Sequence, residues 1–337
     1  MHAWARERLD AHSKIRKAEE AVILCGQLLT QQSDKSPHKW GFERRIWPHV
    51  ESVNRSFRTL PRLSNQLGKS ELLFDAASNM GQLYCNHGLH SQATHLLEWA
   101  LAGQERFLGE THSSTLSTVE CMAYVCHMQG QYVKALEWYQ HALESTEKTL
   151  GEDHPDTLGT IGNMAYVFHM QGQYEKALEW YQRALDGTQK ALGKDHQDTL
   201  TTVHNMAWVF QMQGQYEKAL EWYRRALDGM EKTLGRDHQD TLGIVNNIAG
   251  VFQQHGQYEK ALELYQRALH GKENILGMDH LETLGTVNNI AAVFRQQGMY
   301  EKALEWYRRA LNGMEQTVGM DHPSTVILMG QAGQFQG

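Results

Sequence analysis

Histidine recurs along this chain at a fixed interval of 42 residues, and histidine is the side chain most often used to hold a metal ion. A zinc ligand lies about 2 Å from its metal, whereas packed helices lie on the order of 10 Å apart. One histidine per repeated unit therefore cannot surround one ion. We expect these residues to cap helices or pack in turns, and we expect no metal site. The positions are His112, His154, His196, His238, His280 and His322.

Other reactive residue types form no catalytic pattern. The sequence contains no His-Glu-x-x-His, no Gly-x-Ser-x-Gly, no Cys-x-x-Cys and no Gly-x-x-x-x-Gly-Lys-Ser/Thr loop. We interpret the chain as a non-enzyme that uses no cofactor and hydrolyses no nucleotide. Its four cysteines show no close paired spacing, and we favour buried reduced thiols of a cytoplasmic protein over disulfide or metal roles. They are Cys25, Cys85, Cys121 and Cys126.

Charge and hydropathy limit the partners further. The net charge is −7, whereas a surface that binds nucleic acid normally needs a strong basic excess. No apolar run approaches the roughly 18 residues of a membrane span, and no charged-then-apolar leader is present. We expect a soluble cytoplasmic protein with neither a nucleic-acid nor a membrane partner.

The histidines belong to a longer unit that begins with a glycine at the same 42-residue interval. Within one unit, apolar residues fall at helical spacing from Leu158 to Phe168, stop at Gly172, and resume from Tyr174 to Leu185. Each unit is therefore expected to form two helices, helix A and helix B. Neither helix can bury its apolar stripe alone, so consecutive units must stack. The repeat glycines are Gly109, Gly151, Gly193, Gly235, Gly277 and Gly319.

The unit resembles the tetratricopeptide repeat in the order of its small and large residues. Asn-Met-Ala-Tyr-Val-Phe at 163–168 is followed by Gly172, Tyr174, Ala177, Tyr181 and Ala184, and the whole pattern returns one unit later. The standard unit has about 34 residues. The longer unit is similar to that of kinesin light chains and of fungal proteins with a nucleotide-binding domain ahead of their repeats. The resemblance covers roughly 67–337 and implies an all-α fold, a right-handed α-solenoid of stacked antiparallel helix pairs.

This frame divides the chain into four parts. Residues 1–66 do not fit it and are expected to form a helical lead-in, and residues 67–108 form a degenerate first repeat. Five regular repeats occupy 109–318, and 319–337 form a truncated repeat with helix A alone. We expect that end to fray or to be covered by another chain, and near-identical units also allow self-association through the solenoid ends.

Two short stretches near the N-terminus suggest a larger context. His-x-Trp-x-Arg-x-Arg-Leu at residues 2–9 resembles the end of the winged-helix segment in NLR-like ATPases, and Trp47–Val50 resembles the following linker in the fungal proteins. The resemblance implies that the chain is the sensor or scaffold half of an NB-ARC protein. The alternative is a cargo or scaffold adaptor of the kinesin-light-chain type, although 1–66 lack the apolar heptads that would pair with a heavy chain.

Differences between the repeats concentrate on one stripe of helix A, at 8, 11, 15 and 18 residues after the repeat glycine. These positions lie within roughly 80° of one another, and we call them the variable stripe. In tetratricopeptide repeats the corresponding stripe lines the concave groove. Exposed positions on helix B hardly change, with lysine at 134, 176, 218, 260 and 302, so we favour a groove diversified for recognition over random drift.

We therefore predict that the concave groove binds a protein or peptide. Tyr124, Tyr166 and Trp208 would form an aromatic wall beside space left by glycines. The helix-A asparagines would bond a peptide backbone, as the resemblance to kinesin light chains implies, or would bond within and between repeats. The predicted contact residues are Glu120, Tyr124, His127, Asn163, Tyr166, His169, His204, Asn205, Trp208, Gln211, Asn246, Asn247, Gln253, Asn288, Asn289 and Arg295.

Overall fold

The computed structural model describes residues 71–86, 88–320 and 323–333, which form thirteen α-helices and no strand. The predicted all-α architecture is confirmed for this part of the chain. The lead-in at 1–66, with both of its motifs and Cys25, lies outside the described residues, as does His322. The chain forms two compact units, one ending at Gln171 and the other beginning at Gly172.

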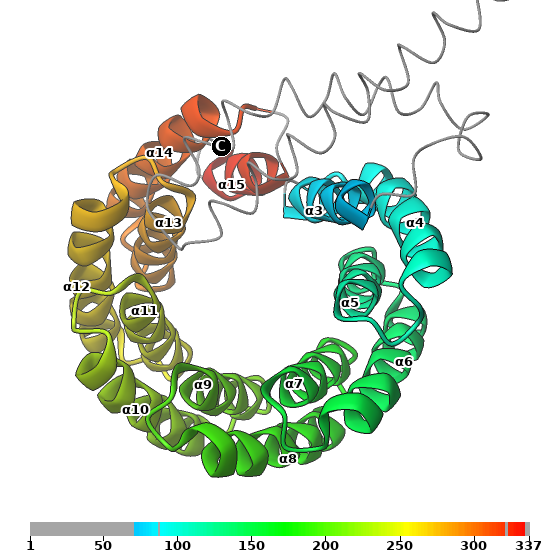
Figure 1. Ribbon diagram of the computed structural model, residues 1–337. Helices are drawn as coiled ribbons and strands as arrows, with labels where there is room; N and C mark the ends of the chain where they lie inside the picture. Colours follow the sequence, from blue (N-terminus) through cyan, green and yellow to red (C-terminus); the bar gives the residue numbers. More distant parts are fainter. Residues whose placement is uncertain (1–70, 87, 321–322, 334–337) are drawn as a thin grey trace, which may run out of the picture. The chain divides into compact units, whose positions relative to one another are not determined.

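The N-terminal unit contains five described helices in two layers. Helix A elements α3, α5 and α7 form one layer, and helix B elements α4 and α6 form the other (Figure 1). Each helix packs against the next along the chain, and α3 also contacts α5. The helices are α3 (Glu71–Asn86), α4 (His90–Phe107), α5 (Ser113–Met128), α6 (Tyr132–Leu150) and α7 (Pro155–Met170).

The C-terminal unit repeats the arrangement. Figure 1 shows α9, α11 and α13 on the concave side of this unit and α8, α10, α12 and α14 on its convex side. We call the helix A elements of either unit its A layer. The helices are α8 (Tyr174–Leu192), α9 (Gln197–Met212), α10 (Tyr216–Thr233), α11 (Gln239–Gln254), α12 (Tyr258–Leu276), α13 (Leu281–Gln296), α14 (Tyr300–Thr317) and α15 (Pro323–Gly333).

The repeated histidine starts helix A of each regular repeat. In α9, the Nδ1 atom of His196 accepts a hydrogen bond from the backbone N–H of Asp198 at 3.2 Å. This bond satisfies one of the free amide groups of the first turn. The same cap occurs at His112, His154, His238 and His280, so the prediction that these histidines cap helices is confirmed.

Two glycines per repeat close the turns because their backbones adopt positive φ angles. Gly214, at the end of α9, has φ 73°, and Gly235, after α10, has φ 96°. Only glycine adopts these angles without steric cost. A threonine fixes the second turn, since the Thr241 hydroxyl donates to the Gly235 carbonyl at 2.8 Å. The regular spacing of these glycines thus places the two turns at the same points of each regular repeat.

The core lies between the two layers and consists of small and aromatic residues. In the C-terminal unit, Ala261 and Ala303 from helix B and Ala291 from helix A are fully buried, as is Tyr307. Small side chains let the helices approach closely, and the tyrosines fill the space between them. This packing fixes which face of each helix A remains uncovered.

Candidate partner-binding surface

The variable stripe lies on the uncovered side of the A layer, but it is partly buried. In the N-terminal unit, Glu120, Tyr124 and Tyr166 are half-buried, whereas His127 and His169 are buried. In the C-terminal unit, His204, Trp208 and Arg295 are half-buried, and Gln211 is buried. The stripe therefore has two depths, and the residue 18 positions after the glycine lies deepest in three repeats.

Aromatic rings cluster between α5 and α7. The ring centroid of His127 lies 6.0 Å from that of Tyr124 and 5.1 Å from that of Tyr166, the second pair edge to face. Burial lowers the pKa of His127 and of His169, which keeps both rings neutral at pH 7. Burial also raises the pKa of Tyr124 and of Tyr166. The two buried histidines therefore pack against the rings of Tyr124 and Tyr166.

Glu120 joins the two helices beside this cluster. Its carboxylate on α5 accepts a hydrogen bond from the hydroxyl of Thr160 on α7. Burial raises the pKa of Glu120, the Thr160 bond opposes that rise, and the nearby Asp156 carboxylate adds to it. The Glu120 carboxyl is therefore poorly hydrated, and no positively charged side chain contributes to the shift of its pKa.

The stripe position of Glu120, 11 residues after the repeat glycine, also forms contacts between repeats in the C-terminal unit. The side-chain amide of Asn247 donates to Nε2 of His204 at 2.7 Å, and His204 Nδ1 lies 3.3 Å from Asn205 Oδ1. One repeat later, Asn246 Oδ1 lies 3.4 Å from the Asn289 amide nitrogen and accepts from Thr286 at 3.2 Å. Asn205, Asn247 and Asn289 thus follow the second of the two predicted roles, bonding within and between repeats.

Asn163 and Asn288 differ from the three asparagines that bond within and between repeats. Asn163 is exposed on α7, and no side-chain partner for it occurs among the described residues. The Oδ1 atom of Asn288 is buried without a hydrogen bond in the same part of the chain. Asn163 is therefore an exposed asparagine whose side chain bonds neither its own repeat nor a neighbouring one among the described residues.

The deepest position of the stripe has a packing function that the sequence comparison missed. The Tyr223 hydroxyl donates to Gln211 Oε1 at 3.0 Å, and the Tyr265 hydroxyl donates to Gln253 Oε1 at 2.9 Å. In the last pair, Arg295 opposes the effect of burial on the pKa of Tyr307. The signal was present in the sequence, since each tyrosine of helix B follows the stripe residue by 12 positions.

Glycines of the stripe leave open space. A Cβ atom built on Gly159, Gly162, Gly243 or Gly285 would meet nothing within 4 Å. A Cβ on Gly250 would lie 3.5 Å from the Tyr265 hydroxyl, which is ordinary contact. The first four glycines therefore border open space, whereas Gly250 mainly accommodates the core tyrosine.

The constant lysines of helix B also have a packing role. Lys218, Lys260 and Lys302 lie 5.6, 5.4 and 5.6 Å from the ring centroids of the helix-A phenylalanines Phe210, Phe252 and Phe294. A cation over an aromatic face is attracted to the ring. These contacts give the lysines a structural reason to stay constant, so helix B is not a neutral control for drift on helix A.

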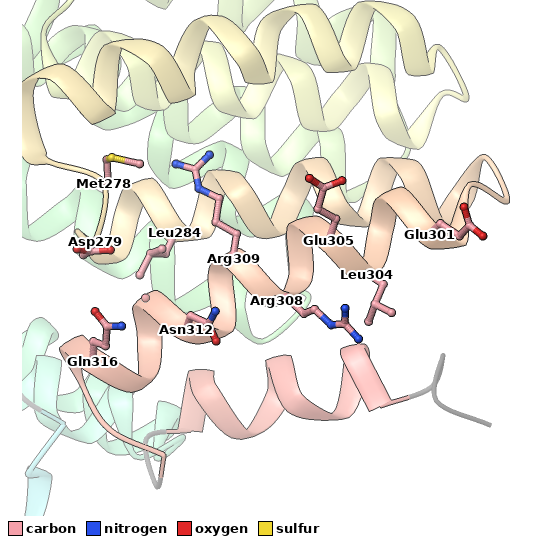
Figure 2. Close-up of a pocket in the computed structure, with 11 residues that line it drawn as sticks. Met278, Asp279, Leu284, Glu301, Leu304, Glu305, Arg308, Arg309, Asn312 and Gln316 are labelled. Carbon is pink, nitrogen blue, oxygen red and sulfur yellow. The ribbon is translucent and has the colours of Figure 1, made fainter.

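A hollow lies in the C-terminal unit, along α14. Its volume is about 690 Å³, and α14 provides most of its lining, with Met278, Asp279 and Leu284 at one end. Figure 2 shows Leu304 and Arg308 on the side of α14 that faces α15. On the other side, Arg309 is bonded to Glu273 of α12. This hollow therefore lies beside the packing contact of α14 with α15 and outside the variable stripe.

Other kinds of site have no support in the described residues. Across 71–86, 88–320 and 323–333, no three His, Cys, Asp or Glu side chains gather to hold a metal ion. No helix in the same ranges is long and apolar enough to cross a membrane. The cysteines described, Cys85, Cys121 and Cys126, are free thiols.

The paired helices, their glycine turns and the recurring core tyrosines match a known family. The model of the tetratricopeptide repeat matches residues 114–190, 158–232, 213–274, 240–316 and 282–335, which together span more than half of the chain. The chain belongs to the tetratricopeptide repeat (TPR) family. Among curated proteins, no sequence matches this TPR chain.

Solved structures agree with the TPR fold. BtubC (BKLC) from P. vanneervenii is 24% identical with a TM-score of 0.56, covering 67% of this chain and 94% of that one. The kinesin-light-chain-like protein of Podosopora anserina, with nearly identical TPR-like repeats, is 25% identical with a TM-score of 0.50, covering 59% and 94%. NprR in complex with its cognate peptide NprX is 16% identical with a TM-score of 0.58, covering 85% and 80%. The predicted all-α solenoid is confirmed.

Proposed function

We propose that this TPR solenoid is a non-catalytic recognition protein whose A layers bind a protein or peptide segment. The observation that carries the proposal is the N-terminal A layer, where half-buried Tyr124 and Tyr166 adjoin open backbone at Gly159 and Gly162. Aromatic anchors beside open space are typical of interfaces. The TPR solenoid itself is an architecture consistent with a protein-interaction scaffold, and in NprR the same fold holds a peptide.

Two biological settings are consistent with such a surface. The first is the sensor or scaffold region of an NLR-like NB-ARC–TPR protein, motivated by the resemblance at residues 2–9. The second is a cargo or scaffold adaptor, and it is supported by the structural likeness to the Podosopora anserina kinesin-light-chain-like protein. We place the chain in the cytoplasm in either case, because its described cysteines are free thiols.

Binding is tested by capturing partners from the source cells on the immobilised full chain. We expect Tyr166→Ala combined with Trp208→Ala to lose the partners retained by the wild type, with its helical circular dichroism preserved. The matched control is Glu137→Ala combined with Glu221→Ala, two exposed acids of helix B. Equal retention by both double variants would exclude the A layers as the binding surface.

The two settings are separated by the coding sequence immediately upstream of Met1. An in-frame Walker-type loop within a few hundred codons supports the sensor, and a run of apolar heptads supports the adaptor. Sedimentation velocity of the purified chain over a range of concentrations tests the expected self-association through the solenoid ends. A single monomeric species at every concentration would contradict it.

A further inference from the structure

The A layer of the N-terminal unit carries acids and neither lysine nor arginine. The acidic residues of α3, α5 and α7 are Glu71, Asp75, Glu120 and Asp156. The lowered pKa of His127 and of His169 adds no positive charge there. This layer therefore presents a negative field to anything that lies against it.

Glu120 is the acid on the variable stripe, and its carboxylate has capacity to spare. An ionised carboxylate offers about four acceptor sites, and Thr160 occupies one of them. No lysine or arginine of the described residues forms an ion pair with Glu120. A half-buried carboxylate without a counter-charge is costly to ionise, so a cation from outside the chain would stabilise it.

Two tyrosines lie on the same part of the layer as this carboxylate. Tyr124 follows Glu120 by one helical turn on α5, and Tyr166 on α7 lies close enough to Tyr124 to contribute to its raised pKa. Aromatic faces and carboxylates both attract cations. The open backbone at Gly162 leaves room beside them, and the unengaged amide of Asn163 is placed to bond the backbone of an extended segment.

We infer that the A layer of the N-terminal unit binds a lysine or arginine side chain of a partner peptide, with Glu120 as its counter-charge and Tyr124 and Tyr166 as its aromatic walls. The inference rests on the proposed function and adds the chemical class of the ligand. It distinguishes this unit from the C-terminal one, where the A layer has Asp198, Asp240 and Glu282 in the first turns of its helices but the variable stripe of α9, α11 and α13 carries Arg295 and no acid.

The test is a selection of short linear peptides from a random phage-displayed library on the immobilised full chain, followed by fluorescence polarisation with the selected peptides. We expect selected peptides to share a basic residue, and we expect its replacement by alanine to weaken binding about tenfold or more, as for one charge-assisted hydrogen bond. Glu120→Gln retains an acceptor for Thr160 and should weaken binding equally. The two changes together should cost no more than either alone, because they remove the same contact. Glu137→Gln, on exposed helix-B surface, is the matched control.

The outcomes distinguish failure of this inference from failure of the proposed peptide-binding function. Selected peptides without a shared basic residue, or losses that add in the double change, overturn the inference while peptide binding stands. A selection that retains no peptide above background overturns both. A lower melting temperature of Glu120→Gln would mean that this variant loses stability as well as binding. In that case Tyr124→Phe is the second test, because it keeps the aromatic ring. The inference then requires Tyr124→Phe to bind lysine-containing peptides as tightly as the wild type does.

Discussion

Some residues of the variable stripe pack against neighbouring residues, and others stay partly exposed. Gln211 and Gln253 accept hydrogen bonds from core tyrosines, and His204 accepts one from the next repeat. Tyr124, Tyr166 and Glu120 keep part of their surface uncovered in the N-terminal unit. Two requirements therefore shape the variation between repeats. A stripe residue must pack or hydrogen-bond with its neighbours in the solenoid, and its exposed part must suit the proposed partner.

The bond between Gln211 and Tyr223 predicts a stability effect. Gln211→Leu should lower the free energy of unfolding by about 1–3 kcal/mol, because it leaves the buried Tyr223 hydroxyl without its acceptor. Urea unfolding followed by circular dichroism measures the change. Adding Tyr223→Phe removes the stranded hydroxyl and should recover part of the loss, and a double variant no more stable than Gln211→Leu would contradict this account.

His204 predicts a dependence of stability on pH. Burial lowers its pKa below 6.5, Asn205 and Asp240 oppose that effect, and the Tyr223 ring lies 5.5 Å away. The unfolded chain then binds protons more readily than the folded chain. The contribution to stability is intact above pH 6.5 and declines as the pH falls from there through the lower folded-state pKa.

Thermal melting from pH 8 to pH 5 measures this contribution. His204→Asn is the control, because Asn246 fills the same position in the next repeat and accepts from Asn289. The melting temperature of that variant should fall less steeply with acidity than that of the wild type. Parallel curves for the two proteins would assign the acid sensitivity to other groups.

At the scale of helices, glycines have two opposite roles. A Cβ on Gly271 of α12 would lie 2.5 and 2.7 Å from the methyl carbons of Leu242, so this glycine lets helix A and helix B pack closely. A Cβ on Gly285 of α13 would meet nothing within 4 Å. The first glycine is required by packing, and the second leaves the A layer open.

These two glycines predict opposite effects of one substitution. Gly271→Ala should destabilise the chain by about 1–3 kcal/mol through overpacking. Gly285→Ala should stabilise it by about 0.5–1 kcal/mol, because alanine favours the helix and meets no neighbour. Chemical denaturation of both variants gives the two signs, and a loss of stability in Gly285→Ala would show that the open space is filled in solution.

At the scale of the whole molecule, each described helix packs mainly against its neighbours along the chain within its own unit. Stability in such a stack is a sum of local terms instead of one cooperative core. The net charge of −7 acts at this scale too, because it gives the whole chain a negative field.

Local stability predicts how far a core defect spreads. Ile290→Ala removes a fully buried side chain in α13 and should cost about 2–5 kcal/mol. Hydrogen exchange should show faster amide exchange in α11–α14, which pack around it. Amides of α3–α6 should exchange at wild-type rates, and a uniform increase along the chain would indicate a single cooperative unit.

Sequence by itself determined the repeat, the helix pairs and their turns. These features are local: the 42-residue interval, the capping histidines and the glycines of positive φ. Each can be predicted from the helix-capping and turn preferences of neighbouring residues. Tertiary structure decided which stripe residues remain uncovered. His127 and Gln211 share a helix face with Tyr124 and Trp208, and only packing against neighbouring helices buries the first pair and leaves the second half-buried. The same contacts engage Asn247 while leaving Asn163 available, because a hydrogen bond needs the partner that the adjoining repeat supplies.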